Sequence, residues 1–273
     1  MADAVHIMHL QRGANLWQRW RRENPELSPD LAGLDLSGIR LGDRPMNHCQ
    51  LHRGNLRQLH APTSDWTGTH ALDSTWDGAN LELATLYQMA AVGSEWRGAN
   101  LRGVDAREVN WSAADFRNAT LSQANLSRAI LNRASFSGAI AHGILLIGAI
   151  ADRANFSDGS FLKAAAQGLQ CRNGRGHRLR LGSADCSESD WSRSELVDLH
   201  APWSRWGNAN LSHANLKNAN FRGAKLWRVN FTGANLTGAC LRGADLRGAN
   251  LEGAILSPGA LDTAIPPQDF LKC

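Results

Sequence analysis

The sequence predicts an all-β solenoid, and three features of one repeating unit support this prediction. A large apolar residue recurs at every fifth position, as in the run ANLSHANLKNANFRGAKLWRVNFTG. A small residue, most often Ala, stands two positions before it. The spacing continues without interruption from Leu31 to Leu261, and Gly176 is the one residue at these centre positions that is neither apolar nor Ala.

A five-residue period fits neither an amphipathic α-helix nor a flat β-strand. Each unit must therefore combine a short extended piece with a bend, and it points one large and one small side chain inward. A single unit cannot bury these side chains alone, so successive coils must stack to form a continuous core. We therefore expect one long solenoid domain over residues 31–261.

The A(D/N)LxG pattern of these units resembles the pentapeptide repeat family, and the resemblance covers roughly residues 31–261. It implies a right-handed quadrilateral parallel β-helix with four units, or about twenty residues, per coil. Over this length the resemblance implies nearly twelve coils in unbroken register.

The two ends of the chain are expected to differ from the repeat. Ile7, Leu10, Ala14 and Trp17 recur at helical spacing, and Asn24-Pro25 should end the helix. Residues 1–30 are thus expected to form a short N-terminal helix that caps the open first coil, since solenoid ends need caps. Residues 262–273 cannot continue the pattern and are expected to form a C-terminal cap or tail.

Tryptophan is large for so narrow a core, yet six centre positions hold it. Ser stands two residues before five of the six, and volume-balanced packing is the favoured interpretation, with a Trp-lined binding flank as the alternative. Gly174 and Gly176 remove two inward side chains and leave a thin spot that Trp191 can enter. The six are Trp66, Trp76, Trp96, Trp111, Trp191 and Trp206, and the serines are Ser64, Ser74, Ser94, Ser189 and Ser204.

The stretch CRNGRGHRLR at residues 171–180 places four arginines at outward positions of the repeat. With about twenty residues per coil, residue n stacks on residues n − 20 and n + 20. Opposite charges on adjacent strands pair favourably, so we expect ion-pair ladders here, with a phosphate site as the alternative. The expected pairs are Arg172 with Asp152, Arg175 with Glu195, and Arg178 with Asp158 and Asp198.

Two surface patches are candidate contact sites. In the first, Arg222 stacks on Arg242, and like charges in one column cost stability unless a solvent shell or a partner meets them. The second is apolar and stands where this chain usually has polar residues, which indicates either a contact surface or cover by the chain's own loops. The first patch comprises Arg205, Arg222, Lys225, Arg228, Arg242 and Arg247, and the second comprises Ile130, Ile140, Leu145 and Ile150.

Chemical motifs are missing from the sequence. The ten histidines are scattered without metal-ligand spacing, the five cysteines form no CxxC pair, and no phosphate-binding or nucleophile motif occurs. We therefore expect no catalytic residues, no cofactor and no metal. The N-terminus lacks the features of a signal peptide and no apolar segment is long enough to span a bilayer, so a cytoplasmic location without membrane association is expected.

These features favour a non-enzymatic, bacterial-type binding protein that presents a patterned surface to a protein partner. An anionic partner could bind the C-terminal basic patch, and a homodimer is possible. The family resemblance adds a second interpretation, because some pentapeptide repeat proteins mimic duplex DNA and bind type II topoisomerases. Such mimicry needs a strongly negative surface, which a net charge of +4 disfavours. An adaptor or accessory protein of a secretion or toxin system is a third interpretation.

Overall fold

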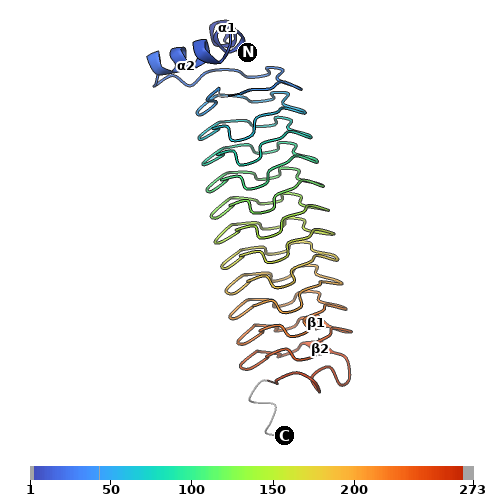
Figure 1. Cartoon of the computed structure of the whole chain (residues 1–273). Helices are drawn as coiled ribbons and strands as arrows, with labels where there is room; N and C mark the ends of the chain where they lie inside the picture. Colours follow the sequence, from blue (N-terminus) through green and yellow to red (C-terminus); the bar gives the residue numbers. More distant parts are fainter. Residues whose placement is uncertain (1–2, 43, 267–273) are drawn as a thin grey trace.

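The computed structural model, which describes residues 3–42 and 44–266, is a rod of stacked coils with two helices at its N-terminal end (Figure 1). Bridging residues pair in parallel with residues twenty positions later, from Asp30–Gln50 to Asp245–Ile265. Within the described residues one pair of strands extends beyond single bridges: β1 Asn235–Leu236 pairs in parallel with β2 Ile255–Leu256. The predicted all-β solenoid with a twenty-residue coil is confirmed.

Each five-residue unit is a short extended segment followed by a turn. The amide of Leu34 donates to the carbonyl of Leu31 at 3.1 Å and closes such a turn, and the next residue bridges to the adjacent coil. The third residue of the turn has a positive φ, as at Gly33 (73°) and Arg53 (56°). For a residue other than glycine this conformation is unfavourable by roughly 1–2 kcal/mol, so contacts between coils must hold the turn.

Large side chains from equivalent units stack along the rod axis. The rings of Trp76 and Trp96 lie 4.6 Å apart, at an angle of 7°. This separation is close to the spacing of about 4.8 Å between neighbouring strands, so one ring per coil fills the column. The column contains Trp76, Trp96, Phe116, Phe136 and Phe156, and its next member is Gly176.

The thin spot at Gly176 is filled from neighbouring coils. The ring of Trp191 lies 5.8 Å from that of Phe156, although the coil that contains Gly176 stands between their backbones. A Cβ atom on Gly176 would lie 2.8 Å from Cδ2 of Leu196. The missing side chain thus leaves room for Leu196 and Leu179, and Trp191 reaches the ring of Phe156 across this coil, as the sequence predicts.

All six tryptophans at centre positions are buried, so they belong to the core and the Trp-lined flank is wrong for them. Four of them donate from Nε1 to the serine two residues earlier, as Trp76 does to Ser74 at 2.7 Å. Ser189 donates to the carbonyl of Cys186, a bond that the other four serines also make to a carbonyl, but it accepts none from Trp191, whose Nε1 has no partner within the described chain. The serines therefore satisfy a buried indole N–H as well as balancing volume.

The N-terminal segment forms two helices, α1 (Ala4–Gln11) and α2 (Ala14–Glu23), where the sequence predicts one. Gly13 separates them with φ 112° and ψ 168°, a conformation that glycine adopts readily and other residues do not. Asp3 caps α1 by accepting from the amide of Val5 at 2.8 Å. Asn24, whose backbone is not helical, ends α2 before Pro25 as expected.

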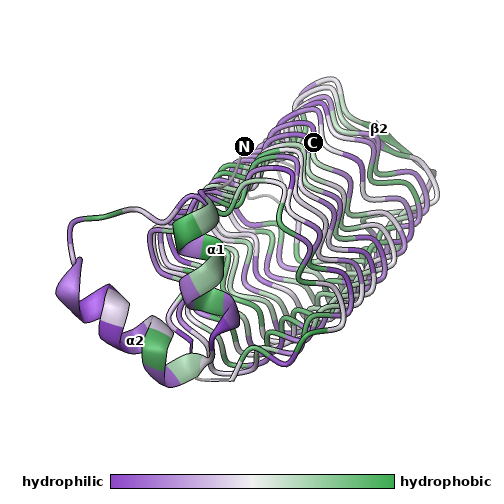
Figure 2. Ribbon diagram, turned by 90° about the horizontal axis from the view of Figure 1, so that it is seen from above, coloured by the Kyte–Doolittle hydropathy of each residue, from purple (hydrophilic) through white to green (hydrophobic). Residues whose placement is uncertain are grey.

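Both helices are attached to the first coil, at the end of the rod seen in Figure 2. The amide of Asp3 donates to the carbonyl of Asp30, and the amide of Asp30 donates to Nδ1 of His6 at 3.0 Å. Nε1 of the fully buried Trp17 donates to the carbonyl of Pro45 at 2.7 Å. Because Asp3 and His6 pair both backbone groups of Asp30, the first bridging residue, the segment acts as the predicted cap.

The opposite end departs from the repeat after Leu256. In the regular repeat the amide of Gly223 donates to the carbonyl of Arg242, nineteen positions later. The amide of Gly243 donates to the carbonyl of Thr263, one position further along, whereas the amide of Leu246 donates to the carbonyl of Ile265 with the regular offset. Pro258, which lacks an amide, and Gly259, with φ 72°, lie in this segment. The register therefore differs from the predicted one in the last unit, and most of the expected tail, residues 267–273, lies outside the described residues.

Replacing Leu126 by Asp should destabilise the rod by more than about 3 kcal/mol, because it buries a charge without a partner in a one-dimensional core. Urea unfolding followed by circular dichroism measures this change. Gln123→Asp is the control, since residue 123 is exposed and Asp tolerates its φ of 62°. Equal unfolding midpoints for the two variants would contradict the inward placement of Leu126.

Replacing Ser74 by Ala should cost about 1–3 kcal/mol, because Nε1 of Trp76 then stays buried without an acceptor. Ser189→Ala is the matched control: it removes a similar bond to a carbonyl, but no indole bond. Chemical denaturation of both variants compares them. The assignment fails if Ser189→Ala is as destabilising as Ser74→Ala.

Candidate functional site: a basic face near the C-terminal end of the rod

Two of the expected ion pairs form in the arginine-rich stretch. Arg172 donates from Nε and Nη2 to the carboxylate of Asp152, with a shortest distance of 2.6 Å. Arg178 lies 2.6 Å from the carboxylate of Asp158. The hydrogen bonds from Arg172 lower the pKa of Asp152. These two arginines are therefore ladder partners of the preceding coil, as predicted.

The other two expected pairs do not form within the described residues. Arg175 bridges to Glu195 through the backbone, but the Glu195 carboxylate accepts from Nδ2 of Asn215 at 2.9 Å. Asp198 likewise accepts from Asn218, not from Arg178. In both cases the acidic side chain hydrogen-bonds to an asparagine of the following coil, so these two predicted contacts are wrong.

The six predicted basic residues come together on one side of the rod, which we call the basic face. Arg205 and Lys225 lie one above the other in its middle, and in the same column Asp185 precedes them and Asp245 follows them. The turns on either side of this column carry the remaining four. Arg222 and Arg242 occupy one corner, and Arg228 and Arg247 occupy the other, with all six side chains exposed.

Two cations of the basic face have carboxylate partners. Nη2 of Arg205 donates to Asp185 at 2.8 Å, a pair that the sequence analysis did not foresee. Arg247 donates to Asp245, and these hydrogen bonds lower the pKa of that carboxyl. The other four cations have no ion pair among residues 3–42 and 44–266; they are Arg222, Lys225, Arg228 and Arg242.

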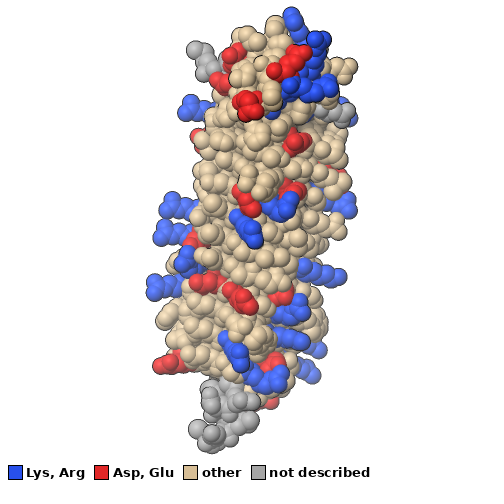
Figure 3. All heavy atoms as spheres, turned by 90° about the vertical axis from the view of Figure 1, so that its left-hand side faces the viewer, with Lys and Arg blue, Asp and Glu red and all other residues tan. Residues whose placement is uncertain are grey.

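Figure 3 shows this difference in charge along the rod on one side of the molecule. Lys and Arg lie beside Asp and Glu over most of the visible surface, but several of them gather near the C-terminal end with few acidic side chains between them. In the coils nearer the N-terminus, Arg97 contacts Glu95 and Asp115. Cations without an ion pair among the described residues also occur along the rod, but the four on the basic face lie close together in two adjacent coils.

Two tryptophans that the sequence analysis passed over border the basic face. Trp203 is 62% exposed and has φ 55°, although bulky residues seldom adopt positive φ. Trp227 is half-buried at the opposite corner, and the guanidinium of Arg228 lies 5.9 Å from the centre of its ring. The sequence did contain evidence for their exposure, since neither tryptophan occupies one of the inward-facing centre positions of the repeat.

The predicted apolar patch is not one surface, so its assignment as a single contact site is wrong. Ile130 bridges to Ile150, but Ile140 pairs with Thr120 and Ser160, and Leu145 pairs with Asn125 and Ala165. With four units per coil, residues five and ten positions apart lie on adjacent and opposite sides. The four side chains are therefore distributed over three sides, and Ile130 and Ile150 alone form a stacked pair.

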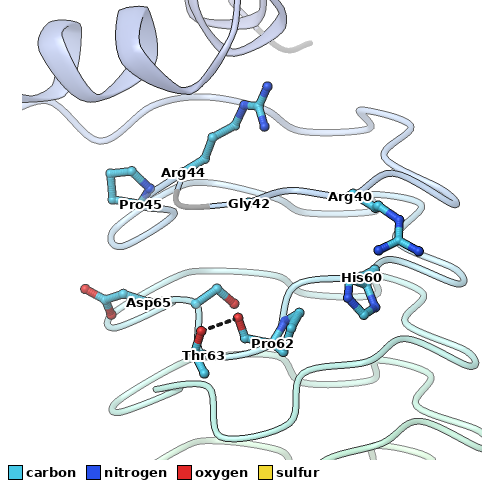
Figure 4. A pocket seen from close by; sticks show the side chains of 9 residues that line it. Arg40, Gly42, Arg44, Pro45, His60, Pro62, Thr63 and Asp65 are labelled. Atoms are coloured by element: carbon cyan, nitrogen blue, oxygen red, sulfur yellow. Dashed lines mark hydrogen bonds between the residues drawn. The ribbon is translucent and has the colours of Figure 1, made fainter.

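A hollow of about 530 Å³ lies between the first two coils (Figure 4). Arg40 and Arg44 line it but point in different directions, and Nη1 of Arg44 donates to the carbonyl of Leu41 at 2.5 Å. Asp65 accepts from the amide of Thr67. The polar groups of this hollow are thus directed apart or to the backbone, and they do not converge on a common point.

A second cluster of ionisable groups lies nearer the N-terminus, where Arg57, Arg97 and Arg117 share the carboxylates of Asp77, Glu95 and Asp115. Among the described residues no group of three or more His, Cys, Asp or Glu side chains could hold a metal ion. Burial raises the pKa of the Cys49 thiol to about 12. No helix in the described part of the chain is long and apolar enough to cross a membrane.

Comparison with known proteins agrees with the repeat seen in the structure. The family model for pentapeptide repeats matches residues 97–133, 129–161 and 214–253, in eight copies. The chain thus contains pentapeptide repeats in these segments. Its fold is the right-handed quadrilateral β-helix that the resemblance predicts. No curated protein matches this chain significantly.

Solved structures of pentapeptide repeat proteins resemble the chain over most of its length. HetL, involved in heterocyst differentiation regulation in Nostoc sp. strain PCC 7120, is 24% identical over 92% of this chain and 96% of its own, with a TM-score of 0.34. Full-length QnrB1, a plasmid-mediated fluoroquinolone resistance protein, is 18% identical over 89% of this chain and 100% of its own, with a TM-score of 0.25. Such low scores support no conclusion about function.

The stability of the rod should depend on Asp152 in acid. The pKa of this carboxyl is lowered from 3.8 by its hydrogen bonds to Arg172, so the unfolded chain takes up the proton first as the pH falls. The stabilisation is therefore complete above the unfolded pKa and is lost as the pH falls through the lower, folded pKa. Unfolding midpoints from about pH 5 to about pH 2 should fall less for Asp152→Asn than for the unaltered chain.

Arg172→Gln is the control, because it removes the cause of the shift and keeps the carboxyl. It should flatten the acid limb of the stability curve as Asp152→Asn does. Parallel curves for all three proteins would show that the ion pair adds nothing in solution.

Proposed function

We propose that this pentapeptide repeat protein is a non-enzymatic binding protein that presents the basic face to a protein partner with an acidic surface. The observation that carries the proposal is the gathering of Arg222, Lys225, Arg228 and Arg242, which have no ion pairs among the described residues, on one side of a regular rod. Like charges in adjacent coils repel one another, and a complementary partner removes that cost.

The mixture of groups on the basic face favours a protein over a uniformly anionic polymer. Asp185 and Asp245 stand in its central column, each bound to an arginine, and would repel a continuous line of phosphates. Trp203 is exposed beside these charges. Trp and Arg are the residues most enriched at the energetic centres of protein interfaces, where charged rims provide orientation.

A binding role agrees with the shape of the surface. The sides of the rod consist of short bridges and tight turns, and the hollow at Lys225, Trp227 and Arg247 is open to solvent. Catalytic sites usually enclose their substrate and combine acid and base groups. On the basic face the acidic groups are instead held by arginines, which suits recognition of another surface.

The alternative role as a DNA mimic that binds a topoisomerase is not supported by the charge. Such a protein must present a strongly negative surface, whereas this chain has a net charge of +4 and four cations of its basic face have no ion pair among the described residues. No residue specifically favours an adaptor role in a secretion or toxin system. The cytoplasmic location and the possible homodimer stay predictions from the sequence.

Replacing Arg222, Lys225 and Arg242 together by Gln should lower the affinity for immobilised poly-glutamate by about tenfold and flatten its dependence on salt. The reason is that these cations are free to contact the probe. Surface plasmon resonance over a range of sodium chloride concentrations measures both quantities.

Arg172→Gln with Arg175→Gln and Arg178→Gln is the matched control, because it removes the same charge from the arginine-rich stretch. It should change the affinity and the salt dependence less, since Arg172 and Arg178 are already paired. The basic face is not the contact surface if the control variant loses more binding than the first.

A further inference from the structure

The two tryptophans lie at the two opposite corners that border the basic face. Trp203 belongs to the turn before the side that contains Arg205, and Trp227 belongs to the turn after the side that contains Lys225. Arg205 and Lys225 bridge to each other, so the two tryptophans come from neighbouring coils. The indoles thus border one two-coil section of the basic face on its two edges.

Each indole is seated on a glycine of the other coil. A Cβ atom on Gly223 would lie 2.7 Å from Cδ1 of Trp203, and a Cβ atom on Gly207 would collide with the indole of Trp227. Trp203 therefore leans toward the later coil, and Trp227 leans toward the earlier one. Because Gly223 and Gly207 have no Cβ atom, each ring has space to lie over the neighbouring coil. Both indoles therefore lie over the same section and are preorganised for contact.

Its large exposed indole distinguishes Trp203 from other residues at its turn position. The repeat imposes a positive φ on the third residue of each turn, but 62% of the Trp203 surface also stays in contact with solvent beside the basic face. A large aromatic surface exposed beside unpaired cations is typical of a contact site. Leu83 is a useful comparison, because it is 60% exposed with φ 60° above Gly103, but it lies far from the basic face.

Resting on the proposed function, we propose that Trp203 and Trp227 clamp an extended acidic segment of the partner that crosses the basic face. Carboxylates of the segment would contact Lys225, Arg222 and Arg228, while apolar side chains would pack on the two indoles. The two corners lie four positions apart along one side, a span of at most about 14 Å. An extended segment covers that span in about four residues, so its apolar anchors stand about four positions apart.

The test uses a fluorescein-labelled peptide of glutamates with two leucines four positions apart, and the same peptide with serines in place of the leucines. Fluorescence anisotropy gives the affinity of each. We expect the leucine peptide to bind about tenfold more tightly, and Trp203→Asn to remove that advantage. Asn tolerates positive φ, so Trp203→Asn should keep or raise the unfolding midpoint while it weakens binding. Trp227→Ser should weaken binding in the same way.

Leu83→Asn is the matched control, since it changes an equally exposed apolar side chain in the same backbone conformation; it should leave binding unchanged. Equal affinities for the two peptides and no effect of Trp203→Asn would overturn the clamp. The proposed function would still stand in that case if the Arg222, Lys225 and Arg242 variant lost binding, and it would fail if this variant also bound normally. Tighter binding of a single-stranded oligonucleotide of equal charge, weakened by Trp203→Asn, would also overturn the inference by identifying nucleic acid as the occupant.

Discussion

The backbone hydrogen bonds between successive coils determine almost every other contact in this protein. Leu31 donates to Gln50 at 2.8 Å, and Leu126 donates to Leu145 at 2.7 Å with the same offset. Because the offset is constant, each residue stacks on the residues that lie twenty positions before and after it in the sequence. Stacked rings, ion pairs and side chains seated on glycines are all consequences of this register. A residue in the repeat is therefore best understood from its column, and its neighbours in sequence matter less.

The same hydrogen bonds impose a backbone conformation that many side chains resist. The third residue of each turn has positive φ, and residues as different as Arg178 (54°) and Leu83 (60°) occupy it. Glycine removes this cost where it occurs, and its missing Cβ gives space to a side chain of an adjacent coil, as Gly223 does for Trp203. Conformational cost in the turns is thus offset by burial in the core, where the side chain at nearly every centre position is enclosed.

The repeat made the fold and some contacts predictable, because the period alone assigns columns. It gave Arg172 and Asp152 as partners, but it could not foresee that Asn215 would bind Glu195, since choices among flexible polar side chains depend on local geometry. Column arithmetic also separates Ile140 from Ile150, which an argument from polarity alone had joined. The break at Gly13 lies outside the repeat, where no period restricts the chain. The candidate site was predicted in its charges but not in its tryptophans.

Side chains in a column contact only those of the neighbouring coils. A charge in the rod is therefore neutralised only if an opposite charge lies near it in the same or an adjacent column. Arg172 has Asp152 one coil away, whereas Arg222 has Pro202 on one side and Arg242 on the other. Among residues 3–42 and 44–266 no long loop crosses this surface to correct the difference, since the sides consist of bridges and tight turns. Unpaired charge therefore stays where the sequence of a column puts it. In such a fold, a change of partner specificity needs only substitutions within a few columns, while the hydrogen-bonded register beneath them remains the same.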